Sequence, residues 1–118
     1  MIDDVFCKII NKEIDAEIIM EEEDWLAFKD LHPAAPVHIL IVPKKHIGSI
    51  LEIADSDGKL IGELIIAAKK VAQKMGLDKG FRIIINNGSH GGQMVPHLHL
   101  HLLGGRPLGA KIVRDPEE

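Results

Sequence analysis

Three histidines recur at every second position near the C-terminal end of the chain, at His97, His99 and His101, with leucine between them. Successive side chains of a β-strand point to opposite faces, so we expect the three imidazoles to share one face, with neighbours roughly 6.7 Å apart along the strand. The leucines would then face a core. Imidazole titrates near neutral pH, so this row is suited to proton transfer, nucleophilic attack or metal binding.

A glycine-rich segment, residues 87–93, lies just before the histidine row. Gly88, Gly91 and Gly92 permit backbone conformations that are closed to other residues and leave amide N–H groups uncovered. Converging amides bind phosphate-like anions. A glycine-rich loop alone indicates no more than a turn, but together with the histidines it predicts phosphoryl or nucleotidyl transfer.

Five strands and two helices are expected to position these residues. Hydrophobic periodicity and turn signals predict strands over residues 16–21, 25–30, 37–42, 81–86 and 97–103 and a short helix over 4–11. They also predict a long helix that is capped at Asp55, Ser56 or Asp57 and ends at Gly76. Short connections between strands favour antiparallel pairing, so we expect an α+β fold with an antiparallel sheet.

The apolar face of the long helix is unusually wide. Its apolar positions between Leu60 and Met75 cover an arc of roughly 160°, against the ~100° that one core-facing helix usually shows. The extra width indicates that a second surface covers this helix. A subunit partner and a loop of the same chain are both candidates.

Composition limits the class of protein. A chain of 118 residues with 46% apolar residues is expected to form one domain over residues 1–118, with an irregular tail from about residue 107. A net charge of −4 without a basic face argues against nucleic acid as a partner. The single cysteine, Cys7, excludes an internal disulfide. We find no signal-peptide pattern and no apolar run long enough for a bilayer, so we expect a cytoplasmic protein that does not bind membranes.

The segment His97–Leu103 resembles the His-φ-His-φ-His-φ-φ motif of the histidine triad (HIT) superfamily, where φ is apolar. Similarity to the histidine triad nucleotide-binding (Hint) branch runs almost ungapped through Phe6–Ile10, Leu26–Asp30, Ala35–Lys44, Gly91–Gln93 and Leu103–Arg106. This resemblance implies a homodimer whose two five-stranded sheets join into one. It also implies hydrolysis of purine nucleoside phosphoramidates, such as AMP linked through nitrogen to an amine.

The resemblance also assigns roles to individual residues. His99 matches the nucleophile, His101 a position near phosphate and leaving group, His97 a supporting position, and His38 a fourth histidine. Asp30 matches the carboxylate that binds the ribose hydroxyls. The base would lie between Val5, Phe6, Ile9, Phe28 and Leu31, and the phosphate beside Asn86, Gly92, Gln93, Met94 and Val95. Met94 replaces a serine of some relatives, so only its backbone N–H can contact phosphate there.

A nucleophilic imidazole needs a fixed tautomer. One ring nitrogen must be a free base while the other donates to a partner, and we expect a backbone carbonyl on or near the strand to be that partner.

Some relatives bind zinc through Cys-x-x-Cys and two histidines. Here the corresponding positions are Asp4, Cys7, His46 and His97, and a carboxylate can replace a thiolate as a zinc ligand. The sequence predicts no cofactor and leaves a structural zinc at this weakened set open. Three other functions stay open: dinucleoside polyphosphate hydrolysis, a nucleotide-binding interaction module with little catalysis, and a metal site formed by the histidine row itself.

Overall fold

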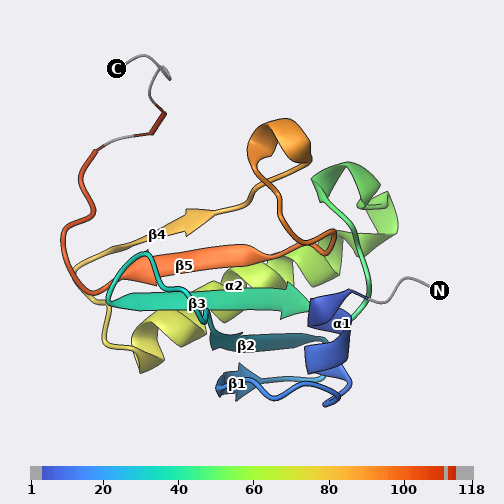
Figure 1. The fold of residues 1–118 in the computed structure, drawn as a ribbon, viewed down its shortest axis with the longest axis horizontal. Helices are drawn as coiled ribbons and strands as arrows, with labels where there is room; N and C mark the ends of the chain where they lie inside the picture. Colours follow the sequence, from blue (N-terminus) through green and yellow to red (C-terminus); the bar gives the residue numbers. More distant parts are fainter. Residues whose placement is uncertain (1–3, 111, 114–118) are drawn as a thin grey trace.

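One antiparallel sheet organises the protein, in a computed structural model that describes residues 4–110, 112 and 113. The strands lie in the order β1-β2-β3-β5-β4, with a long helix on one face and a short helix on the other (Figure 1). The strands are β1 (Ile18–Glu21), β2 (Trp25–Lys29), β3 (Val37–Pro43), β4 (Phe81–Ile84) and β5 (Leu100–Gly104); the helices are α1 (Val5–Ile10) and α2 (Gly58–Lys74). The predicted α+β class and the antiparallel pairing are confirmed.

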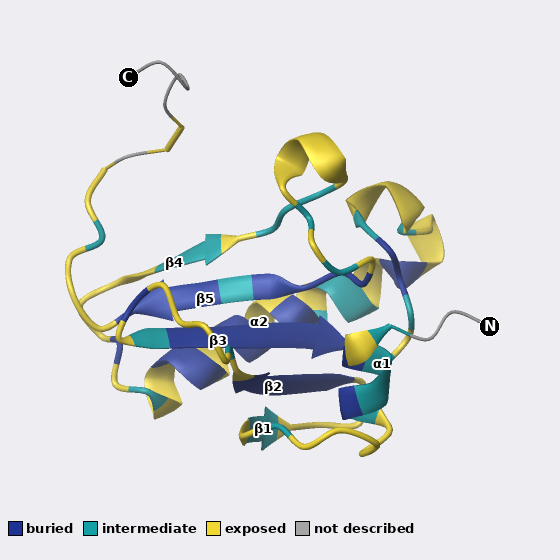
Figure 2. Ribbon diagram, viewed as in Figure 1, coloured by how far each residue is buried: buried dark blue, intermediate teal, exposed yellow. Residues whose placement is uncertain are grey.

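Alternation along the central strands divides the apolar side chains between two cores. One face of the sheet packs against α2 through Trp25, Ala27, Ile39, Ile41, Leu98, Leu100 and Leu102. The opposite face packs against α1 through Leu26, Phe28, Leu40 and Val42. The middle of the sheet is consequently buried on both sides, as Figure 2 shows for β2 and β3. Residues that line a cavity on the α1 side therefore stand on a rigid platform.

Both helices begin at an aspartate, but the two carboxylates act differently. Asp4 caps α1 by accepting a hydrogen bond from the Cys7 N–H at 2.8 Å. Asp57 occupies the N-cap position of α2, as predicted, yet its side chain accepts the Ala54 N–H at 3.0 Å and pairs with Lys45. It therefore closes the turn before α2 instead of capping α2 itself.

The histidine strand is shorter than predicted. β5 begins at Leu100, so His97 and His99 precede it and only His101 lies within the strand. The reason is that its neighbour β3 ends at Pro43, which has no N–H to donate. The chain instead makes a tight turn in which His97 N–H bonds Val95 O at 2.8 Å, and Leu98 N–H bonds Ile47 O at 2.6 Å. Alternation survives, because Leu98 faces the α2 core while His97 and His99 both contact Phe6 of α1.

The outer face of α2 is not covered by the described residues. Ile65 and Ile66 are 54% and 52% exposed, although the inner face of the helix is buried. Within the described residues, no loop of the same chain covers these two side chains. No helix in that part is long and apolar enough to cross a membrane.

The α2 core gives a prediction about stability. Leu64 is 1% exposed, so Leu64→Ala should lower the free energy of unfolding by about 2–5 kcal/mol, through lost burial and a residual cavity. Urea denaturation measures the change. Leu51→Ala, at an exposed position, is the control and should change it little. Equal losses for the two variants would contradict the packing described here.

Candidate active site

His99 is held in one orientation by its own main chain. Its Nδ1 lies 2.6 Å from the carbonyl oxygen of His97. A carbonyl can only accept a hydrogen bond, so Nδ1 carries the proton and Nε2 of a neutral ring carries a lone pair. This is the kind of partner that the sequence analysis expected. The Phe6 ring packs edge-on against His99, with ring centroids 5.0 Å apart, and limits rotation of the imidazole.

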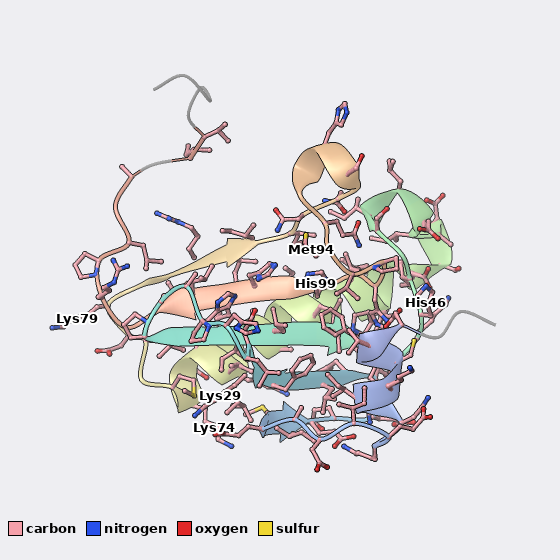
Figure 3. All side chains as sticks on the ribbon, viewed as in Figure 1. Lys29, His46, Lys74, Lys79, Met94 and His99 are labelled. Atoms are coloured by element: carbon pink, nitrogen blue, oxygen red, sulfur yellow. The ribbon has the colours of Figure 1, made fainter. Side chains whose placement is uncertain are left out.

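Burial keeps the His99 ring uncharged. The ring is 5% exposed, and this burial lowers the pKa of His99, an effect that the hydrogen bond to His97 only partly opposes. Figure 3 shows His99 near the start of β5. An uncharged imidazole with a fixed tautomer is a nucleophile or a general base at neutral pH.

A second imidazole pair fixes the protonation of His101. The Ala34 N–H donates to His38 Nδ1 at 3.0 Å, so His38 carries its own proton on Nε2. That Nε2 lies 3.0 Å from His101 Nδ1, which must therefore accept. The remaining proton of His101 is on Nε2. The nearest Asn86 atom, Nδ2 at 3.5 Å, is also a donor, so it does not accept this proton, which stays available to a ligand. Burial, with the neighbouring His99 and His38, lowers the pKa of His101 to about 4.

These two rings open onto a cavity of about 430 Å³, within the usual size range of small-molecule sites. One half is apolar, with the Phe6 and Phe28 rings 5.6 Å apart in an edge-on arrangement. The cavity brings together Val5, Phe6, Ile9, Phe28, Asp30, Leu31, Asn86, Gly92, Met94, Val95, His99 and His101 from the sequence-predicted set. Gln93, His38 and His97 do not line it.

Asp30 lines this cavity, and neighbouring groups hold its carboxylate. One of its carboxylate oxygens accepts the His32 N–H at 2.8 Å, and the other lies 3.5 Å from His38 Nε2. The carboxylate is thus fixed in place and keeps acceptor capacity for a ligand.

The glycine-rich loop differs from the expected anion cradle. The N–H groups of Gly91, Gly92 and Gln93 bond carbonyls of Gly88 and Ser89 within the loop. Gly88 and Gly92 have φ of 70° and 79°, which makes this tight turn possible. The expectation that these glycine amides point at an anion is therefore wrong, because the turn itself consumes them.

Gln93 explains how the loop is held. Its Oε1 accepts the Gly88 N–H at 2.9 Å, and its Nε2 donates to Gly48 O at 2.6 Å and Val95 O at 2.9 Å. Gln93 therefore positions the loop, and both N–H groups of its side-chain amide are used within the protein; its place beside the phosphate stays a prediction.

Met94 and Val95 follow this loop and line the cavity. Within the described residues neither N–H donates a hydrogen bond, so both remain available to a ligand. The Met94 side chain is 91% exposed and lies at the cavity mouth, beside the loop that follows β4 (Figure 3).

The four candidate zinc ligands lie together in the folded chain. The donor atoms of Asp4, Cys7, His46 and His97 all lie within 4.8 Å of one another. Cys7 Sγ is 3.6 Å from both Nδ1 atoms, and Asp4 Oδ2 is 3.1 Å from both. Tetrahedral zinc, with Zn–S of about 2.3 Å and Zn–N of about 2.0–2.1 Å, would place S and N roughly 3.6 Å apart and N and O roughly 3.3 Å apart. The four residues therefore fit a cation of this type.

The donor chemistry agrees with this fit. His97 Nε2 lies 2.9 Å from Pro43 O, so Nε2 carries a proton and Nδ1 is the nitrogen that would give its lone pair to a cation in the cluster. Burial alone would raise the pKa of Asp4, but the Cys7 N–H and the neighbouring His97 outweigh it and lower this pKa, so the carboxylate is charged.

The histidine row itself does not converge on one ion. Among the described residues, His97 belongs to the cluster above and His101 to a second group with Asp30 and His38, while His99 belongs to neither. The hydrogen bonds described for His38 and His101 already account for the second group.

A larger hollow, of about 680 Å³, lies at the other end of the sheet, where α2 ends and β4 begins. None of the histidines lines it, and its charged side chains are Asp78, Lys79, Arg82 and Arg106. Size alone therefore does not identify the reactive site, and the perturbed imidazoles do.

Several cavity residues were not predicted: Ile14, Asp15, Ala16, Lys29, His32 and Leu40. Leu40 could have been found from alternation, because it shares a face with Phe28 and His101, its partners across the sheet. The segment that returns from α1 to β1 carries no such pattern, and its position follows only from the packing of α1.

Together, the fold and the cavity define a small antiparallel α+β domain with a buried, neutral histidine facing a half-apolar pocket. A model of the HIT domain matches residues 11–108, and the chain belongs to this family. It is 50% identical over 106 residues to an uncharacterized HIT-like protein of Synechocystis sp., covering 90% of this chain and 93% of that protein.

Solved structures agree. A HIT family hydrolase from Clostridium thermocellum superposes with a TM-score of 0.92 at 47% identity, covering 96% of this chain and 99% of the other. One from Legionella pneumophila gives 0.88 at 48% identity, covering 91% and 96%. The protein is thus a HIT family hydrolase-like protein.

The low pKa of His101 predicts a pH-dependent stability. Between about 6.5 and 4, an unfolded chain binds a proton at this imidazole and the folded chain does not, so the free energy of unfolding should fall as pH falls through this range. Urea denaturation across this range measures the slope. His101→Gln should flatten it, whereas His90→Gln, at an exposed position, should not. An unchanged slope in His101→Gln would contradict the assignment.

Proposed function

We propose that this protein cleaves the P–N bond of purine nucleoside phosphoramidates of the AMP–amine type, as the Hint branch does, through a nucleotidyl intermediate on His99. The observation that carries the proposal is the hydrogen bond from His99 Nδ1–H to His97 O at 2.6 Å. It leaves the Nε2 lone pair of a neutral ring in a cavity that also holds a second neutral imidazole donor.

In the first step, His99 Nε2 attacks the α-phosphorus and the P–N bond breaks. The departing amine takes up one proton from solvent, and the ring becomes a cationic nucleotidyl-imidazolium whose Nδ1–H remains on the His97 carbonyl. His101 Nε2–H, oriented by His38, donates a hydrogen bond to the phosphoryl group or to the bridging nitrogen. The N–H groups of Met94 and Val95 are the backbone donors at the same place.

In the second step, water attacks the same phosphorus and the P–N bond to His99 breaks. One proton is released, nucleoside monophosphate leaves, and the imidazole returns to its neutral state. Splitting one displacement into two is the gain of nucleophilic catalysis.

The cavity supports a nucleoside as the bound group. The edge-on pair Phe6 and Phe28, with Val5, Ile9 and Leu31, forms an apolar wall for a base, and the fixed Asp30 carboxylate offers acceptors for ribose hydroxyls.

Exposed apolar residues on α2 and the edge strand support a homodimer. Ile65 and Ile66 on α2, and Phe81 and Ile84 on β4, are all exposed on the single chain. β4 pairs only with β5 among the described residues, so its outer edge can pair with another strand. We propose that a second copy covers this surface and joins the two sheets.

Trapping the intermediate tests the mechanism. Protein quenched during steady turnover of an AMP–amine substrate should carry one nucleotidyl group, which peptide mass spectrometry should map to His99. His99→Ala should lose the adduct and at least a thousandfold of kcat/KM, while His90→Ala, in an exposed loop, should keep both. An unmodified His99 during turnover would overturn the mechanism.

The substrate class is tested separately. Turnover of the AMP–amine substrate should exceed that of diadenosine polyphosphates. The reverse order would favour dinucleoside polyphosphate hydrolysis, and negligible turnover of both would favour a nucleotide-binding interaction module.

Oligomeric state tests the second copy. The protein should sediment as a dimer at micromolar concentration, and Ile66→Glu should shift it to a monomer because a buried charge would oppose association. Leu51→Glu, at another exposed apolar position, should leave the dimer intact. Sedimentation of the unaltered protein as a monomer would refute the proposal.

A further inference from the structure

The four-donor cluster joins three segments that are far apart in the sequence. Asp4 and Cys7 lie at the N-terminal end of α1, His46 follows β3, and His97 precedes β5. Figure 3 shows His46 near α1, away from the cavity mouth marked by Met94. The segments also meet through the Leu98 N–H to Ile47 O bond and the packing of Phe6 on His97, and the cluster adds a direct contact among side chains of all three.

His97 belongs to this cluster and also holds the nucleophile. Its Nδ1 faces Asp4 and Cys7, its Nε2–H is bound to Pro43 O, and its carbonyl accepts the His99 Nδ1–H. The ring is fully buried and thus cannot move without moving its own main chain. Any change at Nδ1 of His97 therefore acts on the same residue whose carbonyl orients His99.

A second path runs from the cluster to the same imidazole. Asp4 uses one carboxylate oxygen to cap α1 and points the other at His46 and His97. The capped helix carries Phe6, whose ring packs on His99 at 5.0 Å and on His97 at 5.9 Å. Both restraints on the His99 ring, the carbonyl at Nδ1 and the aromatic edge beside it, thus depend on groups that the cluster anchors.

We propose that a divalent cation of the zinc type, bound by Asp4, Cys7, His46 and His97, acts through His97 as a positioning device for His99. The cation takes no part in bond breaking. It fixes the His97 main chain and the start of α1, and these set the tautomer and orientation of the nucleophile. The inference rests on the proposed role of His99, but the orientation of the ring can be measured without any reaction.

The experiment begins with metal content. Tag-free protein should hold about one zinc per chain, and protein refilled with Co²⁺ should show the visible absorption of a tetrahedral site and a sulfur-to-cobalt band in the near ultraviolet. Cys7→Ser should lose the sulfur band, and Asp4→Cys should strengthen it. Absence of bound metal would overturn the proposal, and an Asp4–His97 ion pair would then fill the cluster.

The coupling between the metal site and the His99 ring is measured on the His99 imidazole. In nitrogen-correlated NMR spectra of the zinc-loaded protein, His99 should show one slowly exchanging Nδ1–H, assigned with His99→Gln. Removing zinc with a chelator should broaden or shift this signal, while the signals of His38 and His101, which are held by Ala34, should change much less. An unchanged His99 signal in metal-free protein would overturn the coupling.

Kinetics and folding controls complete the test. Zinc removal should lower kcat by about tenfold to a hundredfold and leave KM nearly unchanged. This is the usual loss when a group that orients a reacting residue, without touching the substrate, is removed. Circular dichroism should show that the stripped protein remains folded. His90→Ala should behave as the unaltered protein. If the His99 signal responds to zinc but no phosphoramidate is cleaved, the proposed function fails and the coupling stands.

Discussion

The buried imidazole of His97 is the constraint on which the site depends. It has no exposed surface, and its hydrogen-bonding groups face the Pro43 carbonyl on one side and Asp4 and Cys7 on the other. A buried polar ring is stable only when its donors and acceptors are satisfied, so its position is tightly determined. The same residue offers the carbonyl that fixes His99. The orientation of the nucleophile is thus a consequence of how one polar side chain is satisfied inside the protein.

The segment after β3 gives the rest of the site its register. Ile47 O accepts the Leu98 N–H, Gly48 O accepts from Gln93, and the Ile50 N–H donates to Asn87. The glycine-rich loop and the histidines are therefore aligned on one short stretch of backbone that belongs to neither. This arrangement replaces a sheet ladder at the place where Pro43 ends β3.

Much of the fold follows from local rules. Alternation along 25–29 and 37–43 divides the residues between the two helices, and the wide apolar arc predicted for α2 included Ile65, which is exposed in the structure. The start of β5 was misjudged because the His-Leu alternation continues through residues that have lost their strand partner. Hydrophobic periodicity predicts which face a residue occupies, but it does not predict whether a neighbouring strand is present to pair with it.

The site was harder to predict at the level of individual atoms. The sequence identified the histidines and most cavity residues, but it could not show that Gln93 closes the loop or that the glycine amides are consumed by the turn. Those facts depend on which backbone groups come within hydrogen-bonding distance after folding. Likewise, the sequence gives Asp4 as a candidate zinc ligand, and only the folded chain shows its carboxylate shared between a helix cap and two imidazoles.

In the His38–His101 pair, a backbone group decides which imidazole donates and which accepts. The Ala34 N–H donates to His38 Nδ1 and so sets the donor and acceptor roles of the pair. Every residue type except proline has this N–H. Exchanging the side chain at that position leaves the polarity of the relay intact. Position 34 can therefore carry any residue other than proline while the proton of His101 stays on Nε2.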